Sequence, residues 1–234
     1  MSTLVVIPTY NEKDNVQKLI PQILNLEGKI NVLIVDDNSP DGTGEAVNKL
    51  KEEFPDRVFV IHRTGKLGFA SAYIEGFQFA LEMDVDYIIS MDADFSHNPA
   101  FLPEFISELK DYDVAVGSRY RHGTVSVVNW PIKRLILSRF ANLYAKIVTG
   151  LKINDCTSGF VGYRADVLEG INFKNIVSDG YSFLIEMKYR AYKKGYKLTE
   201  VPIVFEERRL GQSKMSKRII FEALFVVWRI RFGF

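Results

Sequence analysis

The stretch "DYIISMDADFSH", residues 86–97, runs from an apolar segment directly into two aspartates that stand one position apart. The apolar segment predicts a buried strand, and Asp92 and Asp94 come at its end. Carboxylates this close repel each other unless a cation or a proton lies between them. If the strand conformation continues to Asp94, both side chains point to one side and could hold one hard cation. A solvated turn is the alternative for a D-x-D triplet taken alone.

Short β-rich runs and helical patterns alternate through the first half of the chain. Besides residues 86–92, four runs read as strands that are apolar on both faces, at residues 3–7, 31–36, 57–62 and 113–118. Amphipathic stretches such as residues 15–27 and 70–83 lie between them. Continuous apolar strands separated by helices predict an α/β fold with a mainly parallel sheet and helices on both faces.

The segments that follow the five predicted strands are polar or rich in glycine, and all carry charged groups. They are "PTYNE", "DDNSPDGT", "RTGKLG", "DADFSH" and "RYRHG". Ligands of such sheets bind beyond the carboxyl ends of the strands, so we expect the functional site there. An NAD-binding oxidoreductase would need G-x-G-x-x-G after the first strand, and "IPTYNE" contains no glycine.

Length and composition bound the class of protein. The 234 residues, 47% hydrophobic and 25% charged, fit one large globular domain or a domain with a small appendage. Cys156 is the one cysteine, which excludes an internal disulfide, and three scattered histidines make no zinc-type cluster. The start "MSTLVVIPTYNE" has no basic segment before a long apolar core. We therefore expect no signal peptide and a cytoplasmic location.

The charge is distributed unevenly along the chain. Residues 188–234 hold 12 Lys or Arg against 4 Asp or Glu, a net charge of +8, so the remainder carries −7 within a total of +1. A basic C-terminal segment suits an anionic partner, which could be nucleic acid, a phosphorylated substrate or anionic lipid. A solvated basic surface is the alternative, and the chain shows no nucleic-acid-binding motif.

The C-terminal stretch "KRIIFEALFVVWRIRF", residues 217–232, predicts an amphipathic helix. Such a helix would be roughly 24 Å long, short of a ~30 Å hydrocarbon core. Basic residues flank it, and Trp228 and several phenylalanines lie within it, which suits a helix at a membrane interface. A helix packed on the domain core is the alternative. A longer parent chain, cut before membrane spans, is a further one.

Acidic segments indicate a bound cation and a nucleotide. Mg²⁺ or Mn²⁺ is often held by one or two carboxylates together with substrate phosphates, which suits Asp92 and Asp94 with a nucleotide diphosphate. In "VDDNSPDGTGEAV", Asp37 could accept hydrogen bonds from a base edge. Ser39, Asp41 or Thr43 could instead only cap the helix that follows.

A series of motifs in one order extends this reading over nearly the whole chain. They are "IPTYNE", "VDDNSPDGT", "HRTGKLGFASAYIEGF", "MDADFSHNP", "GSRY", "NWPIKRLILS", "TSGFVGYR", "SDGYSFLIEM" and "EVPIVFEERRLGQSKMS". From about Leu4 to Ser216 the chain resembles the dolichol-phosphate and polyprenol-phosphate mannose synthases, of the inverting glycosyltransferase family 2. "IPTYNE" with D-x-D is common to many sugar transferases, whereas "NWPIKRLILS" and "FEERRLGQSKMS" are particular to the polyprenyl-phosphate branch.

The resemblance implies a fold of the GT-A type and a reaction. Mannose would move from GDP-mannose to dolichyl or polyprenyl phosphate with inversion, giving a β-linked product, with Mg²⁺ or Mn²⁺ as the metal. The residues expected to bind the nucleotide sugar are Pro8, Tyr10, Glu12, Val35, Asp37, Asp92, Ala93, Asp94, Arg208 and Lys214. The metal ligands would be Asp92, Asp94 and Ser96; some relatives have Gln at the position of Ser96, and water is the alternative third ligand.

Cations are what the acceptor chemistry requires. A phosphate monoester is largely dianionic at neutral pH, so its oxygen can attack without a general base. Fixed cations overcome the repulsion between an anionic donor and an anionic acceptor. The resemblance assigns the acceptor phosphate to Arg119, Arg134 and Ser138, and the last two are four apart on the predicted helix of residues 131–148. Asp94, Arg119, Arg208 and Lys214 are the residues expected to carry catalysis, the last two on a mobile basic loop to which Gly211 gives freedom.

Residues 1–215 would form the catalytic domain and residues 216–234 the C-terminal helix, peripheral on the cytoplasmic face of a membrane, with or without a small membrane-anchoring subunit. A glucosyl or other glycosyl transferase using the same lipid is the nearest alternative. A catalytically silent homologue that binds sugar nucleotide is another.

Several residues remain open between a structural and a functional role. Arg63 or Lys66 could contact the diphosphate, although "HRTGKLG" lacks the ending of a P-loop. Asp155 and Asp179 each fit a turn or helix cap as well as a substrate contact. His97 could approach the metal, although its place before "NP" favours a turn. Cys156 favours packing because no neighbouring His would activate it.

Overall fold

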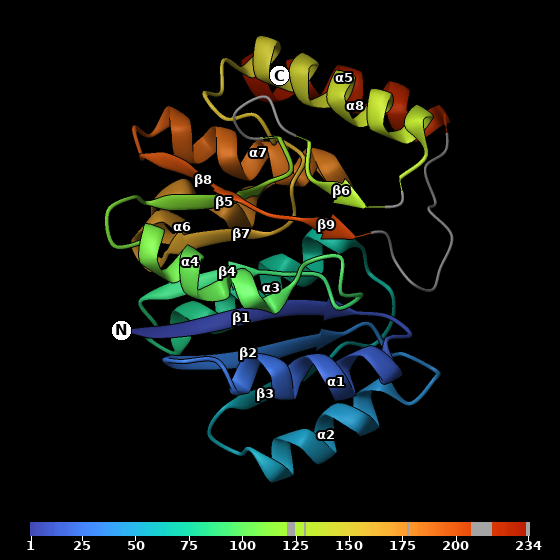
Figure 1. The fold of residues 1–234 in the computed structure, drawn as a ribbon, viewed down its shortest axis with the longest axis vertical. Helices are drawn as coiled ribbons and strands as arrows, with labels where there is room; N and C mark the ends of the chain where they lie inside the picture. The colour runs from blue at the N-terminus through green and yellow to red at the C-terminus, as the bar shows by residue number, and fades with distance from the viewer. Residues whose placement is uncertain (121–124, 129, 177, 207–216, 233–234) are drawn as a thin grey trace.

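A seven-stranded sheet forms the centre of the computed structural model, which describes residues 1–120, 125–128, 130–176, 178–206 and 217–232 (Figure 1). The strand order is β3-β2-β1-β4-β7-β5-β8. The strands are β1 (Ser2–Thr9), β2 (Lys29–Asp36), β3 (Val58–His62), β4 (Tyr87–Ser90), β5 (Val114–Ser118), β7 (Val161–Arg164) and β8 (Leu198–Pro202). A small separate sheet pairs β6 (Val127–Val128) with β9 (Phe205–Glu206).

The pairing is parallel throughout the large sheet except at β7, which runs antiparallel to both β4 and β5. The start of β7 therefore lies at the same edge as the carboxyl ends of β4 and β5. The segment that enters β7 is therefore flanked by the segments that leave β4 and β5. The mainly parallel α/β fold expected from the sequence is confirmed.

Helices cover both faces of the sheet (Figure 1). They are α1 (Lys13–Leu24), α2 (Thr43–Glu53), α3 (Phe69–Glu82), α4 (Leu102–Glu108), α5 (Ile132–Thr149), α6 (Ala165–Ile171), α7 (Gly180–Lys193) and α8 (Lys217–Phe232), with single 3₁₀ turns at Pro99–Phe101 and Phe173–Asn175. Side chains of β1 alternate between the faces: Leu4 and Val6 join the core under α3, α6 and α7, whereas Val5 and Ile7 join the core under α1, α2 and α4. A strand buried on both sides is apolar at every position, as the sequence showed.

One glycine sets how closely α3 approaches the sheet. A Cβ added at Gly76 would lie 2.4 Å from Cγ1 of Val6 and 3.2 Å from Cγ2 of Val35. Neither valine can move, because both are fully buried in the sheet. Gly76 therefore allows the backbone of α3 to lie directly on β1 and β2, which fixes the N-terminus of α3 near the edge that holds the candidate site.

The expected elements agree with the structure except at one strand end. All five predicted strands are present, and the helix expected at residues 217–232 is α8. The strand at residues 86–92, however, ends at Ser90. The condition for placing Asp92 and Asp94 on one side of a strand is therefore not met, because the strand ends before either residue and a bend begins at Ala93.

Helices α5 and α8 lie side by side in a layer at the end of the molecule far from β3 (Figure 1). Within the part of α8 whose side chains are described, Val227 is buried in the core, and Tyr189 of α7 donates a hydrogen bond to the carbonyl of Arg231 at 3.3 Å. Phe225, Trp228 and Phe232 of the same helix are exposed. Among the described residues, no helix combines the length and the apolar character needed to cross a bilayer.

Candidate active site

The turn after β4 places Asp92 and Asp94 in two different settings. Asp94 turns back on the chain, and its Oδ1 accepts a hydrogen bond from the backbone N–H of Ser96 at 3.0 Å. Phe95, between Asp94 and Ser96, has φ 62°, a left-handed conformation that strains a residue with a side chain. The Asp92 side chain is 28% exposed, which leaves it accessible from the sheet edge. A strained turn at a strand end is typical of a functional site.

His97 fixes the start of this turn. Its Nδ1 accepts the backbone N–H of Asp92 at 3.0 Å, which requires the tautomer with the proton on Nε2. The ring is buried and stacks on Phe160 with 5.0 Å between ring centroids. Burial lowers the pKa of His97, although Asp92 and Asp94 act in the other direction. Nδ1 is thus occupied, which supports the turn role over direct metal contact.

The residues present fit a hard divalent cation. Ser96 is 2% exposed, and its Oγ has no hydrogen-bond partner among the described residues. A buried hydroxyl without a partner beside two carboxylates is an oxygen-rich set of the kind that Mg²⁺ and Mn²⁺ bind. The described residues contain no cluster of three or more His, Cys, Asp or Glu side chains that could hold a metal ion. Further ligands would therefore come from substrate phosphates or water.

The turn after β2 is organised by Asp36 and Asp41 and presents Asp37. Asp36 accepts hydrogen bonds from the hydroxyls of Thr9 and Ser39 at 3.0 and 2.6 Å, so it ties the ends of β1 and β2 together. Asp41 accepts the N–H of Thr43 at 3.0 Å and that of Lys13 at 3.1 Å. Burial alone would raise the pKa of Asp41, but the hydrogen bond from the Thr43 hydroxyl, together with those from these N–H groups, lowers it. Of the expected capping residues, Asp41 therefore accepts the first N–H of helix α2.

Asp37 forms a buried ion pair with Arg63, which follows β3. The distance from Arg63 Nη1 to Asp37 Oδ1 is 2.5 Å, and Arg63 Nη2 donates to the hydroxyl of Ser71 at 2.6 Å. Arg63 Nε lies 3.1 Å from a carboxylate oxygen of Glu75, at an angle that makes no hydrogen bond. Arg63 is therefore held inside the protein beside the expected base-binding residue, which favours a role in orienting Asp37.

The other residues expected to bind nucleotide occupy different depths. Tyr10 is 39% exposed, and the ammonium of Lys66 lies 4.3 Å from its ring centroid. The Glu12 backbone N–H donates to Thr43 at 3.0 Å. Pro8 is half-buried in β1, and Ala93 is buried in the turn after β4. Val35 is wholly buried within β2, in the core beneath α3.

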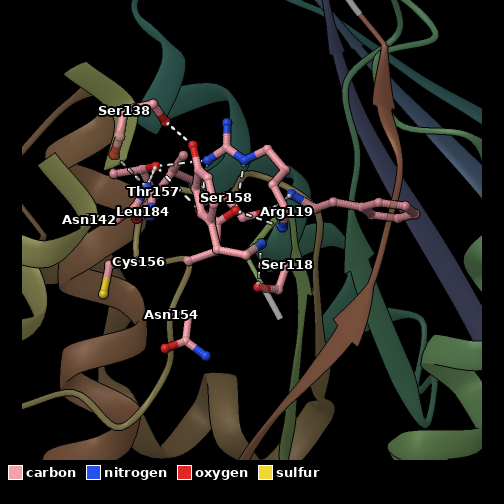
Figure 2. Close-up of polar contacts among 12 residues, drawn as sticks. Ser118, Arg119, Ser138, Asn142, Asn154, Cys156, Thr157, Ser158 and Leu184 are labelled. Carbon is pink, nitrogen blue, oxygen red and sulfur yellow. Dashed lines mark hydrogen bonds and ion pairs between the residues drawn. The ribbon is translucent and has the colours of Figure 1, made fainter. Parts of the chain in front are cut away.

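A second group of polar residues gathers around Arg119, directly after β5 (Figure 2). Its Nε and Nη2 donate to the two carboxylate oxygens of Asp155 at 2.7 Å each, and its backbone N–H donates to the same carboxylate at 3.0 Å. Asp155 is 0% exposed. Burial would raise the pKa of Asp155, but the Arg119 guanidinium holds it below its ordinary value. Asp155 is thus a structural partner that orients the cation.

Aromatic rings surround the same guanidinium. The Cζ atom of Arg119 lies 5.5 Å from the ring centroids of Tyr120 and Trp130 and 5.4 Å from that of Phe205. Its third nitrogen, Nη1, has no hydrogen-bond partner among the described residues. A charge-paired, oriented guanidinium with one free nitrogen is well suited to binding an anion.

Helix α5 brings Arg134 and Ser138 to this group. Arg134 stacks over Trp130 with 4.2 Å from its Cζ to the ring centroid. Tyr120 follows Arg119 directly in the chain, and its hydroxyl donates a hydrogen bond to Ser138 Oγ at 2.7 Å (Figure 2). The residues expected to bind the acceptor phosphate, Arg119, Arg134 and Ser138, are therefore brought into one neighbourhood.

Phe205 connects the two halves of the site. Its ring lies 5.8 Å from that of His97 and 5.4 Å from Cζ of Arg119. Phe205 therefore contacts both His97, which holds the turn of Asp92, and the guanidinium of Arg119. Arg208, Gly211 and Lys214 lie outside the described residues, as does the expected domain boundary after residue 215.

Two of the open residues have structural roles. The Asp179 carboxylate accepts the N–H groups of Ala70 and Gly180, each at 2.8 Å, so it caps both α3 and α7. Cys156 is fully buried, and burial raises the pKa of its thiol to about 12, which fits packing.

Three contributors were missed at the level of sequence. Trp130, Asn142 and Lys188 all touch the acceptor half, and of these only Lys188 had a readable signal. It occupies the helix face shared with Leu184 and Ala191, where an apolar residue is expected. A charged residue on the apolar stripe of a helix is the sign that could have found it.

Comparison with known proteins agrees with this geometry. Residues 4–171 match the model of glycosyl transferase family 2. The chain is 44% identical over 232 residues to a polyprenol monophosphomannose synthase from Mycolicibacterium smegmatis, covering 98% of this chain and 87% of that protein. It is 42% identical over 229 residues to an undecaprenyl-phosphate mannosyltransferase from Micrococcus luteus, covering 98% and 93%.

Solved structures confirm the GT-A type of fold. Glucosyl-3-phosphoglycerate synthase from Mycobacterium tuberculosis, with Mn²⁺, UDP and glucosyl-3-phosphoglycerate, has a TM-score of 0.67 at 17% identity and covers 99% of this chain and 80% of its own. A mannosyltransferase from Pyrobaculum calidifontis, in complex with GDP-Man and Mn²⁺, has a TM-score of 0.59 at 17% identity, covering 97% and 69%. The chain therefore belongs to glycosyl transferase family 2 and is a glycosyltransferase similar to the polyprenyl-phosphate mannose synthases.

Proposed function

We propose that this enzyme transfers mannose from GDP-mannose to a polyprenyl phosphate. The observation that carries the proposal is the arrangement of the site: Phe205 contacts both His97, which holds the turn of the two carboxylates after β4, and the ion-paired guanidinium of Arg119 after β5. The first suits a metal-bound nucleotide diphosphate and the second suits an acceptor phosphate. The names of the two similar proteins support mannose and a polyprenyl phosphate.

The reaction is a direct displacement at the anomeric carbon. One oxygen of the acceptor phosphate forms a bond to that carbon while the bond to the GDP oxygen breaks, so an α-linked donor gives a β-linked product. The acceptor is largely dianionic at neutral pH and needs no general base. Arg119, with Arg134 beside it, offsets the repulsion between the two anions as they approach.

Asp92 and Asp94, with Ser96 or a water, would hold Mg²⁺ or Mn²⁺. When bound, the cation neutralises charge on the diphosphate leaving group. The neighbouring residues keep the ligands in place: His97 fixes the backbone at Asp92, and the N–H of Ser96 fixes Asp94. Asp37, oriented by Arg63, would accept hydrogen bonds from the base, and Tyr10 would lie against the nucleotide.

An apolar groove on α5 supports the proposal that the acceptor carries a prenyl chain. It is open, apolar and about 310 Å³ in volume, and it is lined by Val125, Leu135, Ile136, Arg139, Phe140 and Leu143. It lies on the helix that also carries Ser138 and Arg134. A phosphate bound at Arg119 could thus extend its hydrocarbon along this helix.

Apolar side chains on α5 and α8 support contact with a membrane surface. Those on α5 repeat at helical spacing and are between 55% and 75% exposed: Ile132, Ile136, Phe140, Leu143 and Ile147. Phe225, Trp228 and Phe232 of α8 add to them. Lys133, Arg139, Arg229 and Arg231 are exposed on the same two helices, which suits an anionic lipid surface.

Vesicle flotation tests the membrane contact. We expect the protein to float with vesicles that contain phosphatidylglycerol, and Phe140→Glu to weaken flotation because a charge enters the apolar face. Tyr112→Glu, a change at an exposed aromatic between α4 and β5, is the matched control. Equal flotation of all three proteins, or none by the wild type, would contradict the contact; the latter would point to a separate protein anchor.

Transfer of labelled sugar tests the reaction itself. GDP-mannose and UDP-glucose would each be offered with polyprenyl phosphate, with and without Mn²⁺, and label would be counted in the organic phase. Metal-dependent transfer from GDP-mannose alone is expected. Transfer from UDP-glucose would keep the mechanism and change the sugar, whereas transfer from neither donor would indicate a silent homologue.

A further inference from the structure

Lys188 of α7 is a buried cation outside the expected site. It is 0% exposed, and its ammonium donates to the carbonyls of Cys156 at 3.1 Å, Ser158 at 2.8 Å and Leu184 at 2.9 Å. Three acceptors match the three protons of an ammonium. Burying a lysine is costly unless its protons are satisfied, so this arrangement marks a specific role.

The carbonyls it binds belong to the turn that holds Arg119. Residues 154–158 carry no helix or strand, so side chains fix the backbone. A carboxylate oxygen of Glu200 accepts the N–H groups of Asn154 and Asp155 at 2.8 and 3.1 Å, and Asn142 Oδ1 accepts that of Thr157 at 3.1 Å. Lys188 adds hydrogen bonds to two carbonyls of the same turn.

Lys188 donates hydrogen bonds to the turn on both sides of Thr157. The carbonyls of residues 156 and 158 flank that threonine, whose hydroxyl accepts from Nη2 of Arg119 at 2.9 Å. Asp155, the residue before Cys156, binds the same guanidinium through both carboxylate oxygens. A shift of this turn would therefore change the direction of Arg119.

We propose that Lys188 is a positioning residue for the acceptor site, whose ammonium fixes the turn at residues 155–158 and through it the Arg119 guanidinium. The assignment of an acceptor phosphate to Arg119 rests on the proposed function. The hydrogen bonds from Lys188 to the turn do not depend on the proposed function.

The role has a pH dependence of defined sign. Burial lowers the pKa of Lys188 to about 8. The charged and titratable groups facing it are Asp155 and Cys156 of the turn and Arg119 after β5. The pKa of Asp155 is lowered, that of Arg119 is raised, and that of Cys156 is raised to about 12, so none of them titrates between pH 7 and pH 9. The acceptor phosphate, with a second pKa of about 6, is already largely dianionic at pH 7 and changes little above it.

Loss of that proton affects activity and stability in opposite directions. A neutral amine donates only two hydrogen bonds to three carbonyls, so the turn loosens above pH 8 and acceptor binding weakens. The pKa of Lys188 in the folded protein lies below its ordinary value of 10.5. The unfolded chain thus binds more protons between these values, and this group makes the unfolding free energy rise with pH across the same window. A merely structural lysine predicts no such opposition.

The test compares Lys188→Met, which keeps length but removes all donors, with Lys193→Met at an exposed lysine of the same helix. In Lys188→Met we expect the acceptor KM to rise about tenfold, as for one lost buried hydrogen-bond network, with the donor KM unchanged. Amide hydrogen exchange in residues 154–160 should accelerate. In the wild type with Mg²⁺, the acceptor KM should rise from pH 7 to pH 9, and in Lys188→Met it should stay flat.

The failures of the two proposals are distinguishable. If the wild type transfers no sugar, the proposed function fails, and hydrogen exchange alone still decides whether Lys188 holds the turn. Unchanged exchange and unchanged acceptor KM in Lys188→Met would overturn the proposal. Equal rises in both KM values would overturn it too, since they indicate general loosening. Should Lys188→Met not fold, the wild-type pH series and its exchange at pH 7 and pH 9 decide the question.

Discussion

The two halves of the site meet the same problem of buried charge in different ways. On the β4 side, Asp92 is partly exposed and the Ser96 hydroxyl lacks a partner among the described residues. On the β5 side, Arg119 and Asp155 are buried against each other. Under the proposed function the first half is completed by the metal and nucleotide that it binds, whereas the charges of the second half are already paired within the fold. Substitutions should therefore separate activity from stability in the first half and combine them in the second.

The largest expected effect is the loss of the buried pair. Asp155→Asn leaves the Arg119 charge buried without its partner, and we expect the free energy of unfolding to fall by about 3–5 kcal/mol. Urea denaturation measures this. Asp166→Asn, which breaks the exposed pair with Arg164, is the control and should change stability by less than about 1 kcal/mol. Equal effects from the two changes would show that burial does not distinguish them.

Acid titration sharpens the same contrast. Because the pKa of Asp155 is lower in the folded protein than in the unfolded chain, its contribution is present above the unfolded pKa and is lost as pH falls through the folded pKa. The wild type should therefore lose stability more steeply below about pH 4 than Asp155→Asn does. Parallel curves from denaturation at a series of pH values would contradict the assignment.

On the other half, Asp94→Ala should remove activity without unfolding the protein. We expect transfer to fall by about a hundredfold or more, because a metal ligand is lost. The unfolding free energy should change by only about 1 kcal/mol, the value of the hydrogen bond from Ser96. Transfer rates at a series of Mn²⁺ concentrations provide the measurement, and the exposed Asp56→Ala is the control. Turnover equal to that of the wild type would refute the metal assignment.

The smallest expected effect is at Asp179, which caps both α3 and α7. Asp179→Ala removes an acceptor from the N-termini of both α3 and α7, and we expect a loss of about 0.5–2 kcal/mol in the unfolding free energy, with KM values unchanged. Thermal denaturation with Asp111→Ala as control measures it. A specific rise in either KM would instead give Asp179 a substrate contact.

Local sequence was sufficient for the scaffold and for the identity of the acidic half. The apolar runs at β1, β2 and β4 predict buried parallel strands because both faces of each are apolar, and parallel strands bring their carboxyl ends to one edge. Asp37, Asp92 and Asp94 follow those strands directly. Their place near the site is thus fixed by local pattern and sheet geometry.

The acceptor half depends on contacts that are remote in the sequence. Arg119 reads alone as a surface charge; its partner Asp155 is 36 positions away, and Lys188 is a further 33 positions along. These residues meet only because β7 enters the sheet antiparallel between β4 and β5, which no local periodicity announces. The sequence thus determined the parallel strands, the edge at which ligands are expected to bind and the paired aspartates, since each follows from short-range pattern. The tertiary structure alone decided which charges are buried and which partners orient them, because those depend on long-range packing.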